Sequence, residues 1–97
     1  MAEVTVTHED RGDSGRYVAR VEGSGDTGHL DWTQREEGVR VATHTLVPPA
    51  IGGRGVAAEL VKALVADARE QGFRIEPRCS YVEAMFRRHR EWGELRA

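Results

Sequence analysis

The spacing of the apolar residues changes once along the chain, between residues 48 and 56, and this change constrains the fold more than any other feature. Before it, apolar and polar residues alternate in short runs, as at residues 4–8 and 17–21, with the period of half-buried β-strands. After it, Val56, Leu60, Leu64 and Ala68 recur at every fourth position, which is typical of an amphipathic helix. The sequence therefore predicts strands first and a main helix second.

The first half of the chain carries signals for four strands. They are expected around residues 4–8, 17–21, 30–32 and 39–47, with turns at 11–15, 23–28 and 36–38. Pro48 and Pro49 end the fourth strand, because proline cannot donate a ladder hydrogen bond. Strands joined by such short turns favour an antiparallel meander.

The second half predicts two helices and one short strand. The helix that starts at Val56 ends before Gly72, a residue suited to a left-handed C-cap. Residues 73–76 form a fifth strand, and Ser80 with Glu83 matches a capping box that would start a last helix. The resulting order, ββββαβα, is an α+β fold, and we expect residues 1–97 to form one domain.

Composition and charge argue against several classes of protein. The formal net charge of −2 disfavours general nucleic-acid binding. No apolar run is long enough for a membrane span or a secretory leader, and a single cysteine fits a reducing compartment. We therefore expect a cytoplasmic protein, a monomer or weak dimer, that binds neither nucleic acid nor a membrane. The spacing of His8, His29 and His89 gives no metal site.

Three glycines, Gly52, Gly53 and Gly55, lie where the fourth strand gives way to the main helix. A helix N-terminus offers unpaired N–H groups, and glycine lets a ligand approach them, so the pattern suggests a phosphate cradle. A flexible turn would account for the same glycines. The loop lacks the Lys-Ser or Lys-Thr pair of a Walker A motif. It also lacks the third glycine of a dinucleotide fingerprint, because Ala58 stands there.

The loop and its surroundings resemble the acyl-CoA site of the GNAT superfamily of N-acyltransferases, in particular a minimal YjdJ-type family of about this length. Three stretches carry the resemblance: HTLVP at 44–48, GRGVA at 53–57 and PRCSYV at 77–82. GHLDW at 28–32 looks like a strand of the same family, and the match covers essentially the whole chain. Two positions depart from the family pattern, since Gly52 replaces a Gln or Arg and Leu46 replaces a Glu.

The resemblance implies that acetyl-CoA, or coenzyme A, binds as a co-substrate and that no metal takes part. The pyrophosphate would lie on the start of the main helix, and the pantetheine arm would lie along the end of the fourth strand, where it separates from the fifth. The residues so implied are Thr45, Leu46, Val47, Gly52, Gly53, Arg54, Gly55, Val56, Ala57 and Ala58, with Ser80 near the thioester.

Cys79 and His44 are the candidate catalytic residues. Cys79 precedes the last helix, whose dipole can lower the pKa of a thiol, and its thiolate could carry the acetyl group. The alternative for Cys79 is a small buried packing residue. His44 could deprotonate the incoming amine, or it could pack against the sheet. Phe86 stands where many GNAT enzymes have a tyrosine that protonates the leaving thiolate, and Tyr81 is the available substitute.

The resemblance leaves functions of different classes open. The first is an acetyl-CoA-dependent N-acetyltransferase that acts on an unidentified exposed amine of a protein or small molecule. The second, which Leu46 and Phe86 favour, is a coenzyme A- or acyl-CoA-binding module with little or no turnover. A plain α+β interaction module would bind neither ligand. The short connection at residues 11–15 cannot hold the helices with which larger GNAT enzymes cover the acceptor, so we expect an open acceptor side.

Overall fold

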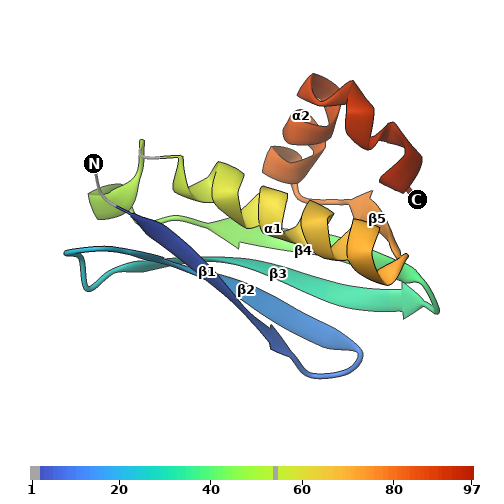
Figure 1. The fold of residues 1–97 in the computed structure, drawn as a ribbon, viewed down its shortest axis with the longest axis horizontal. Coiled ribbons are helices and arrows are strands. Elements are labelled where there is room, and N and C mark those ends of the chain that lie inside the picture. Colours follow the sequence, from blue (N-terminus) through green and yellow to red (C-terminus); the bar gives the residue numbers. More distant parts are fainter. Residues whose placement is uncertain (1–2, 54) are drawn as a thin grey trace.

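The computed structural model describes residues 3–53 and 55–97 and places five strands in one sheet, in the order β1-β2-β3-β4-β5 (Figure 1). The strands are β1 (Val4–Asp10), β2 (Ser14–Val21), β3 (Thr27–Glu36), β4 (Val39–Leu46) and β5 (Arg74–Pro77). The helices are η1 (Pro49–Ile51), α1 (Val56–Gln71), α2 (Ser80–Arg88) and η2 (Arg90–Leu95), of which η1 and η2 are 3-10 helices. The predicted α+β class and the order ββββαβα are confirmed. Within these residues, no helix has the length and apolar character needed to cross a membrane.

The sheet changes character at its last strand pair. The strands β1 to β4 form an antiparallel meander, whereas β4 and β5 run parallel. Parallel strands need a crossover connection, and α1 provides it by lying along one face of the sheet (Figure 1). The backbone N–H groups of Arg78 and Cys79 both donate to the carbonyl of Ala42, over 3.1 and 2.9 Å. In the described chain, β5 accompanies β4 only from Val39 to Ala42, and the remainder of β4 has no strand beside it on that side.

The core lies between α1 and the sheet. Trp32 and Tyr17 are among its largest fully buried side chains, and Gly15 makes room for the indole, because a Cβ there would stand 2.5 Å from the Trp32 ring. Removing this apolar surface from water supplies the main favourable free energy of folding. The buried residues of α1 are Val56, Leu60, Val61, Leu64, Val65 and Ala68.

A glycine caps each end of α1. Gly55 is the N-cap residue with φ of 73°, and Gly72 is the C-cap residue with φ of 82°. The Gly72 N–H donates to the carbonyl of Ala68 over 2.8 Å, which confirms the predicted C-cap. These left-handed conformations favour glycine, because other residues would carry a Cβ into the backbone.

Two polar contacts fix the edge of the sheet and α1 in place. The Tyr17 hydroxyl donates to Asp67 of α1 over 2.7 Å, and the Trp32 indole N–H donates to His8 Nε2 over 2.9 Å. The His8 and Tyr17 rings stack with centroids 4.1 Å apart. Buried aromatic side chains with a polar group need such partners, so these bonds define how α1 sits on β1 to β3.

The start of the last helix corrects one prediction. Cys79, not Ser80, is the N-cap residue of α2, and no side chain caps the helix. Glu83 does not reach back to the helix start, because both of its carboxylate oxygens accept hydrogen bonds from Arg96, at 2.8 and 2.7 Å. The capping-box prediction is therefore wrong. The charged Arg96 guanidinium is a stronger partner for Glu83 than a backbone N–H at the start of α2. Arg96 follows η2 in the chain, so the pattern of residues 80–83 does not reveal it.

Candidate functional site

A cavity of about 280 Å³ opens at the start of α1. It is lined by Val47, Gly52, Gly53, Gly55, Val56, Ala57, Ala58 and Tyr81. Seven of these eight are residues that the sequence predicts for cofactor binding, and the eighth, Tyr81, lies near the beginning of α2. The loop after β4, the first turn of α1 and the first turn of α2 thus meet at one hollow.

The backbone around this cavity is unusually accessible. The N-terminus of α1 has no capping side chain, so the N–H groups of its first turn are not satisfied from within the helix. A Cβ placed on Gly53 or Gly55 would meet no atom within 4 Å, so open space lies in front of both residues. Gly28 of β3 helps to place the helix start here. A Cβ on Gly28 would lie 3.2 Å from the Val56 side chain and 3.3 Å from the Leu46 carbonyl oxygen.

A bulge in β4 decides which way its last residues face. Asp31 pairs with His44 but Trp32 pairs with Ala42, so Thr43 is an extra residue in the strand. Its hydroxyl donates to the Asp31 carbonyl over 3.2 Å. Directly opposed residues of two strands share a face of the sheet. Thr45 therefore lies on the core side with its partner Leu30, while His44 lies on the side turned away from α1.

Cys79 meets Thr45 at the point where β4 and β5 separate. The Sγ atom lies 3.4 Å from Thr45 Oγ1, and the half-buried thiol packs against the core cluster. Burial raises the pKa of Cys79, but the Thr45 hydroxyl and the backbone N–H groups of Val82 and Tyr81 outweigh burial and lower it overall. The uncapped start of α2 thus favours the thiolate, the reactive form of cysteine.

His44 occupies a different environment. It is exposed on the face of the sheet away from α1, and its ring centroid lies 6.0 Å from that of His29. The structure therefore does not place His44 beside Cys79, because the two residues approach β4 from opposite faces.

The other predicted residues are distributed around the same edge. Leu46 is 48% exposed, and Ser80 is exposed at the first position of α2. Arg54 lies outside the described residues. Phe86 is buried and packs edge-on against Trp92, with ring centroids 5.5 Å apart. The Phe86 position therefore carries no acid, whereas Tyr81, 36% exposed, has its side chain at the cavity.

A second hollow, about 370 Å³, lies between the β3–β4 turn and the end of α1. It contains none of the predicted residues, and it is lined by Gln34, Glu37, Gly38, Val39, Arg40, Gln71, Gly72 and Phe73. The Arg40 guanidinium is held between the Trp32 and Phe73 rings, 4.0 and 4.1 Å from their centroids, so it serves packing. Residues 3–53 and 55–97 bring together no group of three or more His, Cys, Asp or Glu side chains that could hold a metal ion.

The comparisons with known proteins agree with this arrangement. The family model described as GCN5-related N-acetyl-transferase matches residues 16–95, from β2 through η2, and so includes the cavity, the bulged end of β4 and Cys79. A comparison with curated proteins finds no match. The family match covers most of the chain, and the chain therefore belongs to the GCN5-related N-acetyltransferase family.

Proposed function

We propose that the protein is an acetyl-CoA-dependent N-acetyltransferase that moves an acetyl group from acetyl-CoA to an exposed amine of a protein or small molecule. Membership of the family supports a transferase of this type. The observation that carries the proposal is the cavity at the glycine-lined, uncapped start of α1. Backbone N–H groups and the positive end of a helix dipole suit a pyrophosphate.

The residues around the cavity fit the rest of acetyl-CoA. Val47, Ala57 and Ala58 offer apolar surface, and Gly53 and Gly55 leave their backbone open. The end of β4 from Thr43 to Leu46 has no β5 neighbour in the described chain, so its backbone groups are available to an extended arm. Such an arm would bring a thioester towards Thr45 and Cys79. The thioester supplies an acetyl group that is already activated for transfer.

Two routes of transfer fit these residues. In direct transfer, the amine nitrogen attacks the thioester carbonyl, the C–N bond forms, the C–S bond breaks and coenzyme A leaves as the thiol. Proximity and orientation can supply much of the rate. In the covalent route, the Cys79 thiolate takes the acetyl group first and passes it to the amine. His44, exposed on the face of the sheet away from α1, would accept the proton that the ammonium group loses.

A coenzyme A- or acyl-CoA-binding module with little turnover is the second candidate. The buried Phe86 and the exposed Leu46 favour it, because neither position offers an acid or a base. Both candidates require coenzyme A binding, but only the transferase releases a free thiol when acetyl-CoA and an amine are supplied together. A thiol-reactive dye with the parent protein therefore separates them.

The cradle itself is tested with the substitution Gly55→Glu. We expect this variant to lose measurable coenzyme A binding in a calorimetric titration, because a carboxylate would stand where the pyrophosphate binds. Gly38→Glu is the matched control: Gly38 also has a left-handed φ of 79° and open space around it, but it lies in the β3–β4 turn. Unchanged affinity in Gly55→Glu, or no binding by the parent protein, would contradict the proposal.

A further inference from the structure

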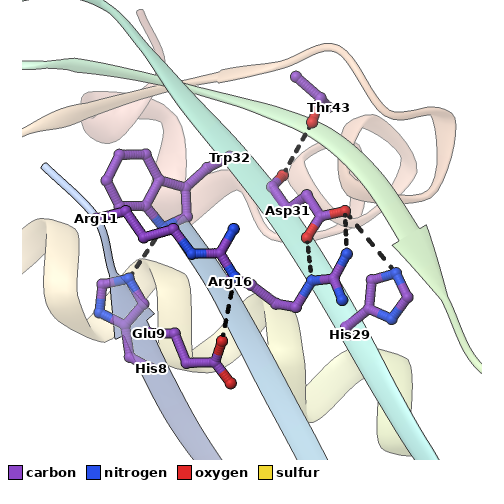
Figure 2. A network of polar contacts seen from close by, with 8 residues as sticks. All are labelled: His8, Glu9, Arg11, Arg16, His29, Asp31, Trp32 and Thr43. Carbon is purple, nitrogen blue, oxygen red and sulfur yellow. Dashed lines mark hydrogen bonds and ion pairs between the residues drawn. The ribbon is translucent and has the colours of Figure 1, made fainter. Parts of the chain in front are cut away.

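A polar cluster on the face of the sheet away from α1 surrounds His44, the proposed acceptor of the ammonium proton. It consists of Arg16 from β2, His29 and Asp31 from β3, and His44 from β4. Figure 2 shows the side chains of Arg16 and His29 converging on the carboxylate of Asp31. The strand register explains the grouping, because Asp31 is directly opposite Arg16 on one side and His44 on the other.

Arg16 orients the Asp31 carboxylate at the centre of the cluster. Arg16 donates to both oxygens of Asp31, over 2.6 Å from Nε and 3.2 Å from Nη2. Such a two-point contact fixes the carboxylate in one orientation. The second oxygen, Oδ2, faces His29 Nε2 at 3.8 Å. The His29 side chain is only 19% exposed, and its ring lies 6.0 Å from the exposed His44 ring, centroid to centroid.

We propose that His29 is a positioning residue of the transfer reaction and acts through His44. Next to the Arg16–Asp31 pair, His29 receives from His44 the proton that the acceptor amine gives up. This inference rests on the proposed acetyltransferase function. The acceptor would approach over the exposed face, where His44 meets it first. His44 takes the proton from the ammonium group, and the neighbouring His29, whose ring centroid lies 6.0 Å from that of His44, receives it in turn. The reaction then balances as ammonium plus thioester to amide, thiol and one proton on the imidazole pair.

The charges that face His29 suit this role. Burial lowers the pKa of His29, and the Arg16 guanidinium lowers it further, while Asp31 raises it and His44 lowers it. The net pKa is below the ordinary value, so His29 is neutral near pH 7, and a proton that it receives from His44 is released readily to solvent. Arg16, Asp31 and His44 are separate side chains on β2, β3 and β4, so their effects can be separated by substitution.

The test measures thiol release from acetyl-CoA as a function of pH, with spermidine and a lysine-containing peptide as probe amines. His29→Gln should lower kcat/KM about 10-fold, less than the roughly 10²–10⁴-fold of a full general-base contribution because His44 remains, with coenzyme A affinity unchanged by calorimetry. His89→Gln is the matched control, because His89 lies at the end of α2, bonded to Glu91, and it should match the parent protein.

Substitutions of Arg16 and Asp31 test the role of His29 through the pH profile of kcat/KM, which would not shift if His29 had only a structural role. Arg16→Gln should shift the acid limb of the kcat/KM profile to higher pH, because it removes a positive charge beside His29. Asp31→Asn should shift the limb to lower pH, because it leaves Arg16 unopposed. Both shifts should vanish when combined with His29→Gln. Histidine titrations followed by NMR should show the same opposite shifts for His29 in variants too weakly active for kinetics.

The outcomes separate the two proposals. If the parent protein binds coenzyme A but releases no thiol with any amine, the acetyltransferase proposal fails. If the parent protein is active, and either the acid limb is the same in all variants or His29→Gln retains full activity, the role of His29 is overturned and the transferase stands.

Discussion

At the scale of single residues, the most informative position is Cys79. Two structural elements contact its sulfur: the Thr45 hydroxyl of β4 and the first backbone N–H groups of α2. Neither contact alone would distinguish a packing residue from a nucleophile. Together they lower the pKa of Cys79 despite burial, which is the condition under which a cysteine becomes reactive.

The lowered pKa of Cys79 predicts the pH dependence of its alkylation. The rate with iodoacetamide should rise with a midpoint below the ordinary thiol value of about 8.5, because the thiolate is the reacting form. Thr45→Val should move the midpoint to higher pH, since it removes the hydroxyl that stabilises the thiolate. Thr7→Val, which changes an exposed threonine of β1, is the control and should leave the midpoint unchanged.

The same thiol decides between the two transfer routes. Intact mass after incubation with acetyl-CoA should show a gain of about 42 Da on the covalent route, lost in Cys79→Ala. A parent protein that turns over without any such gain, and a Cys79→Ala variant of equal rate, would assign the reaction to direct transfer and Cys79 to packing.

At the scale of secondary-structure elements, a hydrogen bond from β2 to α1 adds to the apolar packing between the helix and the sheet. The Tyr17 hydroxyl donates to Asp67, and the ring is fully buried beneath the helix. Burial and the neighbouring carboxylate raise the pKa of Tyr17 far above its ordinary value. Tyr17 thus stays protonated in the folded protein at pH values where an unfolded tyrosine ionises.

This raised pKa predicts a loss of stability in alkali. A group whose pKa is higher in the folded state contributes stability below its unfolded pKa, and loses it as the pH rises above that value. The free energy of unfolding, measured by urea denaturation, should therefore fall above about pH 10 in the parent protein. Tyr17→Phe should be less stable at pH 7 but should show a shallower fall. If the free energy of unfolding fell equally steeply with pH in the parent protein and in Tyr17→Phe, this account would be refuted. Tyr81→Phe, at an exposed position, serves as the control.

At the scale of the whole molecule, the C-terminal segment closes the core. Trp92 of η2 is buried, lies edge-on to Phe86 and stacks on His89 with centroids 4.1 Å apart. The chain then returns to the sheet, where the N–H of Ala97 donates to the carbonyl of Ile75 over 2.8 Å. This segment holds α2, and with it Cys79, against β5.

Trp92→Ala should therefore destabilise the whole protein. Replacing a buried tryptophan with alanine costs about 3–5 kcal/mol, a large part of the about 5–15 kcal/mol that stabilises a typical domain. Thermal unfolding should show a markedly lower Tm, and Trp92→Phe, which keeps an aromatic ring, should recover much of the loss. A Tm within a degree or two of the parent protein in Trp92→Ala would show that the segment is dispensable.

Much of the fold could be predicted from the sequence because its signals are local. Alternation, prolines at the end of β4 and a four-residue repeat from Val56 each act over a few neighbouring residues. The glycines at the start of α1 are equally local, since their effect is to open the backbone where they stand. The three glycines of the cavity follow from this local pattern, whereas the resemblance to the GNAT superfamily implied Val47, Val56, Ala57 and Ala58.

What the tertiary structure alone decided depends on contacts between distant strands. The extra residue Thr43 in β4 turns Thr45 towards Cys79 and His44 away from it, and strand register of this kind is set by pairing rather than by local propensity. Glu83 likewise accepts hydrogen bonds from Arg96 rather than from a backbone N–H at the start of α2, because a charged partner from elsewhere in the chain outweighs a capping bond. The sequence by itself therefore determined the elements and the glycine loop, while the faces on which the reactive side chains lie were decided only when the strands came together.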